Sequence, residues 1–312
     1  MSNLPEFDDL PELEGLGLRH AWEVWGPDDE LGTINLITRE RVAAAAALVR
    51  SGQVISLDLP LTEPDPPLFG RQPYEHHVFA LSRNEMDDRL DNFHLQASTQ
   101  WDALCHVRCR ERGYYGGRTQ DPTEGPNGLG IDRWADHGVA GRGVLVDLAG
   151  WQAEQGLAYD ALDSRAIAVE ELQAVVAAQG TELRTGDLLC IRFGWPGRYR
   201  ALGRADREAY AVDPSFAGLS ADEGMARYLW NAHPAALLCD NPAVETLPGD
   251  PAVGSLHRRL LPCLGFALGE MFDFETLARE CRARGNWEFF FVAAPLKVPD
   301  GLGSPGNAVA IL

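Results

Sequence analysis

The pattern of hydrophobic positions alternates along the chain between short extended runs and longer amphipathic segments, most clearly after about residue 140. Short apolar runs bounded by Gly, Pro, Asp or Asn are typical of buried strands, and a period-two alternation is typical of a half-buried one. On these grounds we predict strands at 54–59, 144–148, 188–193, 236–239 and 264–268.

Helices are expected between these strands. Thr38 has the position of an N-cap for an alanine-rich helix that runs to about Arg50. A second helix is expected around 169–179, ending at Gly180, and Ser220 to Glu223 has the form of a capping box before a third. A short helix at 255–261 completes the set. Alternating strands and helices predict an α/β fold without selecting its topology.

Two long segments lack such periodicity. Residues 60–76 contain five prolines, and residues 113–130 are rich in glycine. Long irregular connections in compact domains often form lids or binding loops. Our candidates for contacts with a small-molecule substrate are the aromatic residues Phe69, Tyr74 and Tyr114 in these segments, and Trp195 after the strand predicted at 188–193.

The first 35 residues are rich in Pro, Gly and acidic residues, with Trp22 and Trp25 among them. Turn-forming residues around aromatic anchors indicate an arm that packs on the body or on a neighbouring subunit. We therefore expect an N-terminal arm at 1–35, followed by a single domain at 36–312.

The net charge of the chain argues against some classes of binding partner. The 312 residues include 27 Lys and Arg against 46 Asp and Glu, for a formal net charge of −19. Phosphate groups would be repelled, which argues against nucleic-acid and anionic-membrane partners. Since no apolar run approaches the length of a membrane helix and the N-terminus is acidic, we expect a cytoplasmic protein.

The six cysteines show no C-x-x-C pair, so disulfide and zinc-knuckle readings have little support. Cys105 and Cys109 flank His106 and are either reactive thiols or small core residues, and we favour the second interpretation.

The stretch from Gln96 to His106 carries the clearest candidate chemistry. Gln96, Gln100, Asp102 and His106 all have even numbers, so an extended backbone would direct all four side chains to one face. A carboxylate and an imidazole are usual ligands of catalytic zinc or manganese. The two glutamines offer carbonyl oxygens to the ion or can hold a water.

This stretch resembles the signature of the cyclase family of metal-dependent hydrolases, His-x-Gly-Thr-His-x-Asp-x-Pro-x-His. Thr99, Asp102 and His106 match, whereas Gln96 and Gln100 replace the first two histidines. Ser98 and Leu104 replace the glycine and the proline. The double-glutamine form is similar to the branch that contains zinc-dependent trans-dienelactone hydrolase.

The resemblance continues near the C-terminus and spans about residues 32–312. The matching features are His257, Arg258, Leu260, Leu261, Glu270, the Pro-Leu-Lys segment at 295–297 and the Gly-Ser-Pro turn at 303–305. It implies a cyclase-like α/β fold, a swivelling β/β/α arrangement with mixed sheets folded toward a barrel and helices outside. It also implies a homodimer or homotetramer.

Family members with the full histidine set hold two zinc ions. Transferred by position, one set of ligands becomes Gln96, Gln100, Asp102 and Glu270, and the other becomes Asp102, His106, His257 and Glu270. Because an amide oxygen is a weaker zinc ligand than imidazole, we hypothesise one divalent ion, zinc first and manganese as the alternative. Gln96 and Gln100 either bind it directly or orient a water.

Two catalytic roles stay open. His106 is either a ligand or a proton shuttle, and Glu270 is our first choice of general base where it does not touch the metal. The resemblance implies a hydrolase that opens a small lactone or cyclic amide. The alternatives are an arylformamidase-type amide hydrolase and a non-catalytic relative that binds a small molecule. The sequence has no G-x-S-x-G or P-loop motif to support a serine hydrolase or a nucleotide-binding enzyme.

Overall fold

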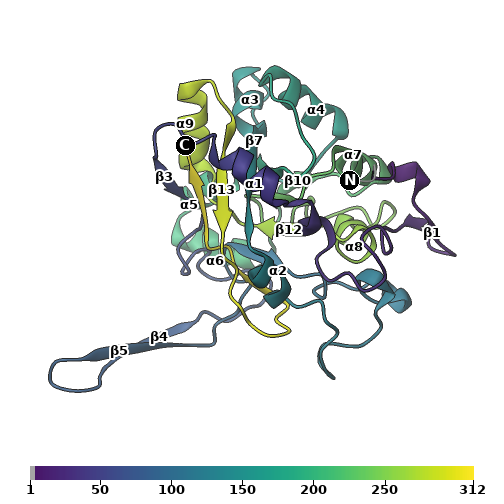
Figure 1. Ribbon diagram of the computed structural model, residues 1–312. Coiled ribbons are helices and arrows are strands. Elements are labelled where there is room, and N and C mark those ends of the chain that lie inside the picture. Colours follow the sequence, from purple (N-terminus) through teal and green to yellow (C-terminus); the bar gives the residue numbers. More distant parts are fainter. Residues whose placement is uncertain (1–3) are drawn as a thin grey trace.

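A curled, nine-stranded mixed sheet forms the centre of the computed structural model, which describes residues 4–312 (Figure 1). Four neighbouring strands, β12, β11, β9 and β7, are parallel, and the strands on both sides of them are antiparallel to their neighbours. In sheet order the strands are β14 (Gly303–Pro305), β6 (Gln100–Asp102), β12 (Ala267–Glu270), β11 (Ala236–Cys239), β9 (Leu188–Arg192), β7 (Val139–Asp147), β13 (Glu288–Ala293), β15 (Ala308–Ile311) and β3 (Val54–Ser56).

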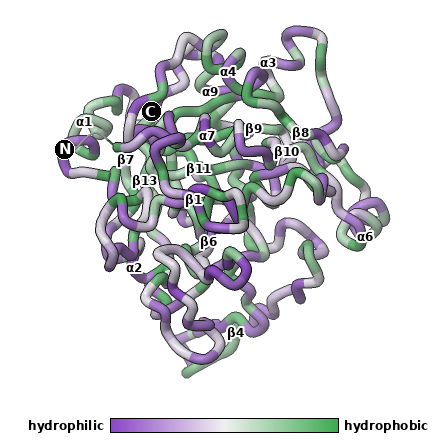
Figure 2. Tube along the Cα trace, turned by 90° about the vertical axis from the view of Figure 1, so that its right-hand side faces the viewer, coloured by the Kyte–Doolittle hydropathy of each residue, from purple (hydrophilic) through white to green (hydrophobic). Residues whose placement is uncertain are grey.

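The expected mixed α/β architecture is thus confirmed. Every residue of β11 and β12 is buried, which explains why these strands appear in the sequence as continuous apolar runs rather than alternating ones. Figure 2 shows hydrophobic residues concentrated along the central strands. The outermost strand, β3, keeps the alternation: Ile55 is buried between exposed Val54 and Ser56.

Helices pack around this sheet, and helix α1 lies against β7 and β13. Their bounds are α1 (Arg39–Ala46), α2 (Asp132–His137), α3 (Leu148–Glu154), α4 (Val169–Ala178), α5 (Trp195–Arg200), α6 (Arg204–Val212), α7 (Glu223–Ala232), α8 (Leu256–Arg258) and α9 (Glu275–Arg284). Strands β8 (Arg165–Ile167) and β10 (Ala217–Leu219) form a small parallel pair.

The predicted helix starts were close to those observed, and two details differ. Thr38 caps α1 by accepting from the Arg41 N–H, as expected. Helix α7 is capped by Asp222 rather than by Ser220, whose hydroxyl donates to the Asp222 carboxylate instead. The helix expected at 255–261 is a three-residue α-helical turn that continues as a π-helical segment, Arg259–Leu264, around Pro262.

A long hairpin was not predicted. Strands β4 (Glu75–Ala80) and β5 (Met86–Asp91) pair with each other and project away from the body (Figure 1). Most of their residues are exposed, so no buried face imposed an alternating pattern on the sequence. The irregular segment before the hairpin is therefore 60–74 rather than 60–76.

Residues 4–35 pack against the body. The Trp22 indole N–H donates to the carbonyl of Pro262 at 2.6 Å, and the rings of Trp25 and Trp230 meet edge to face at 6.0 Å. These contacts are of the kind expected for an aromatic arm. A short hairpin of β1 (Glu12–Leu13) and β2 (Leu18–Arg19) lies in this segment. Within residues 4–312, no helix is long and apolar enough to cross a bilayer.

Candidate metal centre

The pairing of β6 with β12 brings together the two sequence-distant clusters. In this antiparallel pair Gln100 lies opposite Glu270, and Asp102 lies opposite Leu268. Gln100 and Asp102 share a face because they are two residues apart on a strand. The backbone is not extended over the whole stretch from Gln96 to His106, because β6 has only three residues and turns carry its two flanking candidates. The amide Nε2 of Gln96 nevertheless lies 3.0 Å from His106 Nδ1.

Asp102, His257 and Glu270 form the core of the centre, with one possible ligand atom from each lying within 4.8 Å of the others. His257 Nε2 is 2.8 Å from Glu270 Oε1 and 3.8 Å from Asp102 Oδ2. Both acids are buried, with 1% and 3% of their surfaces exposed. Two carboxylates so close together and so poorly hydrated require a positive partner to stay ionised.

The pKa values of these three residues reflect their need for a positive partner. Burial, with help from the nearby Asp102 carboxylate, raises the pKa of Glu270 to about 7. Burial also opposes ionisation of Asp102, but His106 and His257 more than offset it and lower the pKa of Asp102. Burial disfavours the charged form of His257, yet Glu245, Asp102 and Glu270 together raise its pKa well above the ordinary value. The centre is therefore a place where bound cations and protons compete.

Two buried oxygens fit a metal ion. Asp102 Oδ2 and Gln100 Oε1 are buried and accept no hydrogen bond from any residue in the described part of the chain. Gln100 Nε2 donates to Glu270 Oε2 at 2.6 Å, which commits the amide nitrogen and leaves its oxygen free. Buried polar atoms are almost always satisfied, so oxygens left without donors beside an imidazole nitrogen are suited to a cation. Asp102, His257 and Glu270 can hold a divalent ion, with the Gln100 oxygen beside them.

Glu245 is a functional residue that the sequence did not reveal. Its Oε2 lies 2.6 Å from His257 Nδ1, and it also accepts from the backbone N–H groups of Leu256 and His257 and from the Ser255 hydroxyl. A carboxylate that holds Nδ1–H leaves the Nε2 lone pair free for a metal. No spacing signal pointed to Glu245, since the chain between it and His257 is irregular for most of its length.

His106 stands at the edge of the centre. Its Nε2 lies 3.8 Å from Asp102 Oδ1, and 28% of its side chain is exposed. When the Gln96 amide donates to Nδ1, the His106 proton sits on Nε2 and faces Asp102. His106 is not among the three residues that converge within 4.8 Å. This arrangement favours a proton carrier over a ligand.

Arg71 is a second residue that the sequence did not single out. Its guanidinium lies 5.5 Å from the centre of the Phe69 ring and forms no hydrogen bond or ion pair within residues 4–312. Burial lowers the pKa of Arg71, and the charges of Asp102 and Glu270 act against that effect. The centre thus has a partly buried cation nearby whose hydrogen-bonding capacity is unused.

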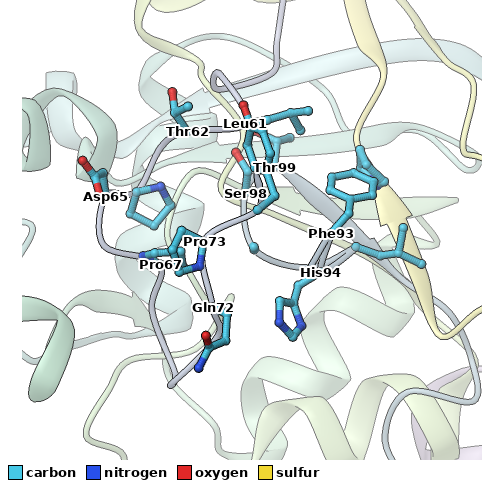
Figure 3. Close-up of a pocket in the computed structure, with 15 residues that line it drawn as sticks. Leu61, Thr62, Asp65, Pro67, Gln72, Pro73, Phe93, His94, Ser98 and Thr99 are labelled. Carbon is cyan, nitrogen blue, oxygen red and sulfur yellow. The ribbon is translucent and has the colours of Figure 1, made fainter. Parts of the chain in front are cut away.

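A cavity of about 160 Å³ lies between two irregular segments of the chain, one of which leads into β6 (Figure 3). Its walls come from residues 61–74 on one side and 93–99 on the other, and Ser98 and Thr99 lead directly into Gln100. Asp102, His257 and Glu270 do not line it. The cavity therefore adjoins the cluster of ligands without containing it.

The four aromatic candidates fall in different surroundings. Tyr74 lines the cavity, and Phe69 is exposed beside Arg71. Tyr114 is buried beneath Arg108, whose guanidinium lies 5.7 Å from its ring centre. Trp195 is fully buried and stacks on Tyr199 at 4.8 Å, so it offers a substrate no surface. It serves the core because it begins α5, which packs inward.

Comparisons with known proteins agree with this architecture. A family model described as a putative cyclase matches residues 37–246. A solved structure described as a novel cyclase is 30% identical, with a TM-score of 0.81, and the match covers 94% of this chain and 99% of the other. No curated protein matches the sequence.

Two isatin hydrolases share the fold at lower identity. Isatin hydrolase A from Labrenzia aggregata, bound to benzyl benzoate, is 16% identical with a TM-score of 0.60, over 85% of this chain and 94% of that one. The Ralstonia solanacearum enzyme is 18% identical with a TM-score of 0.60, over 86% and 95% of the two chains.

Proposed function

The chain belongs to the putative cyclase family, and from this membership and the geometry of the centre we propose that it is a metal-dependent hydrolase that opens a small cyclic ester or cyclic amide. The observation that carries the proposal is the convergence of Asp102, His257 and Glu270. One oxygen of Asp102 and the amide oxygen of the neighbouring Gln100 are buried and accept no hydrogen bond from the described residues. The isatin hydrolases, which share the fold, support a cyclic amide as one substrate class.

Asp102, His257 and Glu270 would hold a single divalent ion, with zinc as our first choice and manganese as the alternative. Amide oxygens are more usual on the harder manganese ion, so a direct bond from Gln96 or Gln100 would favour it. When bound, the ion supplies Lewis-acid activation of a water and of a substrate carbonyl at neutral pH.

Side chains of the protein would carry out the proton transfers. Glu270 is our candidate general base and would take a proton from the attacking water through a carboxylate oxygen that does not hold the ion. His106 is partly exposed and within reach of Asp102, so it can deliver a proton to the leaving oxygen or nitrogen. Glu245 keeps His257 in the correct tautomer and orientation throughout.

We propose that the substrate binds in the cavity formed by residues 61–74 and 93–99. Tyr74 lines the cavity, and Phe69 is exposed on the same irregular segment. Arg71 would offer its unpaired guanidinium to an anionic group on the substrate, because it has no other partner within the described residues. We further propose that the molecule is a homodimer or homotetramer, as family resemblance implies.

A substrate panel tests the function. Protein loaded with zinc or with manganese is assayed for proton release from lactones, cyclic amides and N-formyl aromatic amines, with protein stripped by a chelator as the control. We expect ring opening of a lactone or cyclic amide that depends on the metal. Turnover of only the N-formyl amines would instead identify an arylformamidase. Binding without turnover by metal-replete protein would identify a non-catalytic relative.

A further inference from the structure

Two cysteine thiols lie side by side beneath the N-terminal segment. The sulfurs of Cys109 and Cys263 are 3.6 Å apart, and the Cys263 thiol donates to Cys109. Both residues are fully buried, together with Leu13, under a cover formed by Leu16, Leu18 and Trp22. A disulfide has an S–S length near 2.05 Å, so the sulfurs need to approach by only about 1.5 Å.

The pair joins two segments that matter to the metal centre. Cys109 is three residues beyond His106, and Cys263 lies in the π-helical segment 259–264 that follows the short helix carrying His257. The two cysteines are 154 positions apart in the sequence. A bond between them would fix the His106 segment to the His257 segment.

Cys109 is the more reactive thiol of the pair. The hydrogen bond from Cys263 lowers the pKa of Cys109 to about 7 against the effect of burial, with help from Arg258, Arg110 and Arg112. Burial instead raises the pKa of Cys105 and of Cys281 to about 12. Since the thiolate is the nucleophilic form, oxidation should begin at Cys109.

A route for a small reagent lies next to the pair. A surface hollow of about 300 Å³ is bordered by Leu16 and Leu18, which cover the thiols, and by Arg110 and Arg258, which are adjacent in sequence to Cys109 and His257. Displacing the edge of the short β1–β2 hairpin would open the thiols to this hollow. The oxidant would therefore need to be small.

We propose that Cys109 and Cys263 are a reversible oxidation site that forms a disulfide when the protein meets a hydroperoxide. The Cys109 thiolate attacks one peroxide oxygen of H₂O₂, the O–O bond breaks, and the other oxygen leaves as hydroxide, giving a sulfenic acid. The Cys263 sulfur then attacks the sulfenic sulfur and water leaves. The sum is two thiols and one H₂O₂ giving one disulfide and two waters.

Peptide mapping of peroxide-treated protein tests the proposal. Full-length protein is reduced, freed of reductant, treated with H₂O₂, alkylated and digested. We expect a Cys109–Cys263 cross-linked peptide, loss of two titratable thiols, and full recovery after dithiothreitol. The cross-link should also raise Tm by about 5 °C, since it closes a long loop in the unfolded chain. Six thiols remaining, or a cross-link between other cysteines, would overturn it.

Single-cysteine variants distinguish the roles of the two thiols. In C263S, Cys109 keeps its Arg neighbours but has no resolving thiol, so we expect a sulfenic acid on Cys109 that dimedone traps. C281S is the matched control and should form the cross-link as the wild type does. Trapping at residues other than Cys109 would contradict the assignment. None of these readouts depends on hydrolase activity, so the thiol site and the proposed function can each be refuted without affecting the other.

Discussion

The hydrogen bond between Glu245 and His257 is the contact on which a single substitution should have the clearest effect. It fixes which imidazole nitrogen faces Asp102 and Glu270, and Glu245 itself is held by three further donors from the segment 255–257. The metal centre thus depends on an acid that contributes no ligand of its own.

Replacing Glu245 with Gln should weaken metal binding by about 10 to 100-fold, because the amide cannot hold Nδ1–H as a carboxylate does. Competition with a chromophoric chelator measures the affinity. E223Q serves as the matched control, since it makes the same change at a glutamate at the start of α7, outside the metal centre. Unchanged affinity in E245Q would show that His257 is oriented by something else.

In the proposed function, Arg71 affects a different property, the choice of substrate. Since a charge-assisted hydrogen bond is worth about 1.5 to 3 kcal/mol, R71Q should raise KM for a carboxylate-bearing lactone by about 10 to 100-fold. For a neutral lactone of the same size, KM should change little. Steady-state kinetics on the two substrates gives the comparison, and an equal loss for both would remove Arg71 from substrate recognition.

Among the elements, those with a buried periodic face were predictable and those defined by pairing were not. Strands 188–193 and 236–239 were recognisable because four parallel strands are covered on both faces. The bounds of β6 could not be predicted, since its three residues are fixed by pairing with β12 and β14 rather than by their own pattern. Glu245 was missed for a similar reason: tertiary contact alone brings it to His257.

Asp58, just beyond β3, carries a prediction about pH. Its carboxylate accepts from the Ala308 N–H, its other oxygen is buried without a donor, and burial raises its pKa to about 6 from 3.8. The folded state therefore binds this proton more tightly than the unfolded state. The stabilisation it contributes is complete below about pH 4 and is lost as pH rises to about 6.

Asparagine at position 58 stays neutral, so D58N should gain stability relative to wild type between pH 4 and pH 7, by at most about 3 kcal/mol. Urea unfolding of both proteins at the two pH values measures this difference. The matched control is D87N, on the exposed strand β5. A difference between D58N and wild type that does not change with pH would show that Asp58 is ionised throughout.

At the scale of the whole molecule, the projecting β4–β5 hairpin is the feature that an isolated chain does not explain. Val78, Leu81 and Met86 on it are 61%, 61% and 66% exposed. Exposed apolar residues on a hairpin whose outer edges pair with no other strand in the described chain are more typical of a subunit contact than of a solvated surface. This observation supports the proposed homo-oligomer.

Replacing Val78, Leu81 and Met86 with serine should lower the oligomer mass measured by light scattering, because apolar surface would no longer be buried between copies. Serine at the exposed Leu157 and Val212, away from the hairpin, is the control. A monomeric wild type, or an unchanged oligomer in the hairpin variant, would contradict this role.

Diffraction at the zinc and manganese absorption edges, together with elemental analysis of protein purified without added metal, tests the metal centre most directly. We predict one ion per chain, bound by Asp102, His257 and Glu270, and its loss in D102A and H257A. Two ions per chain, an ion bound elsewhere, or full metal content in H257A would contradict the account.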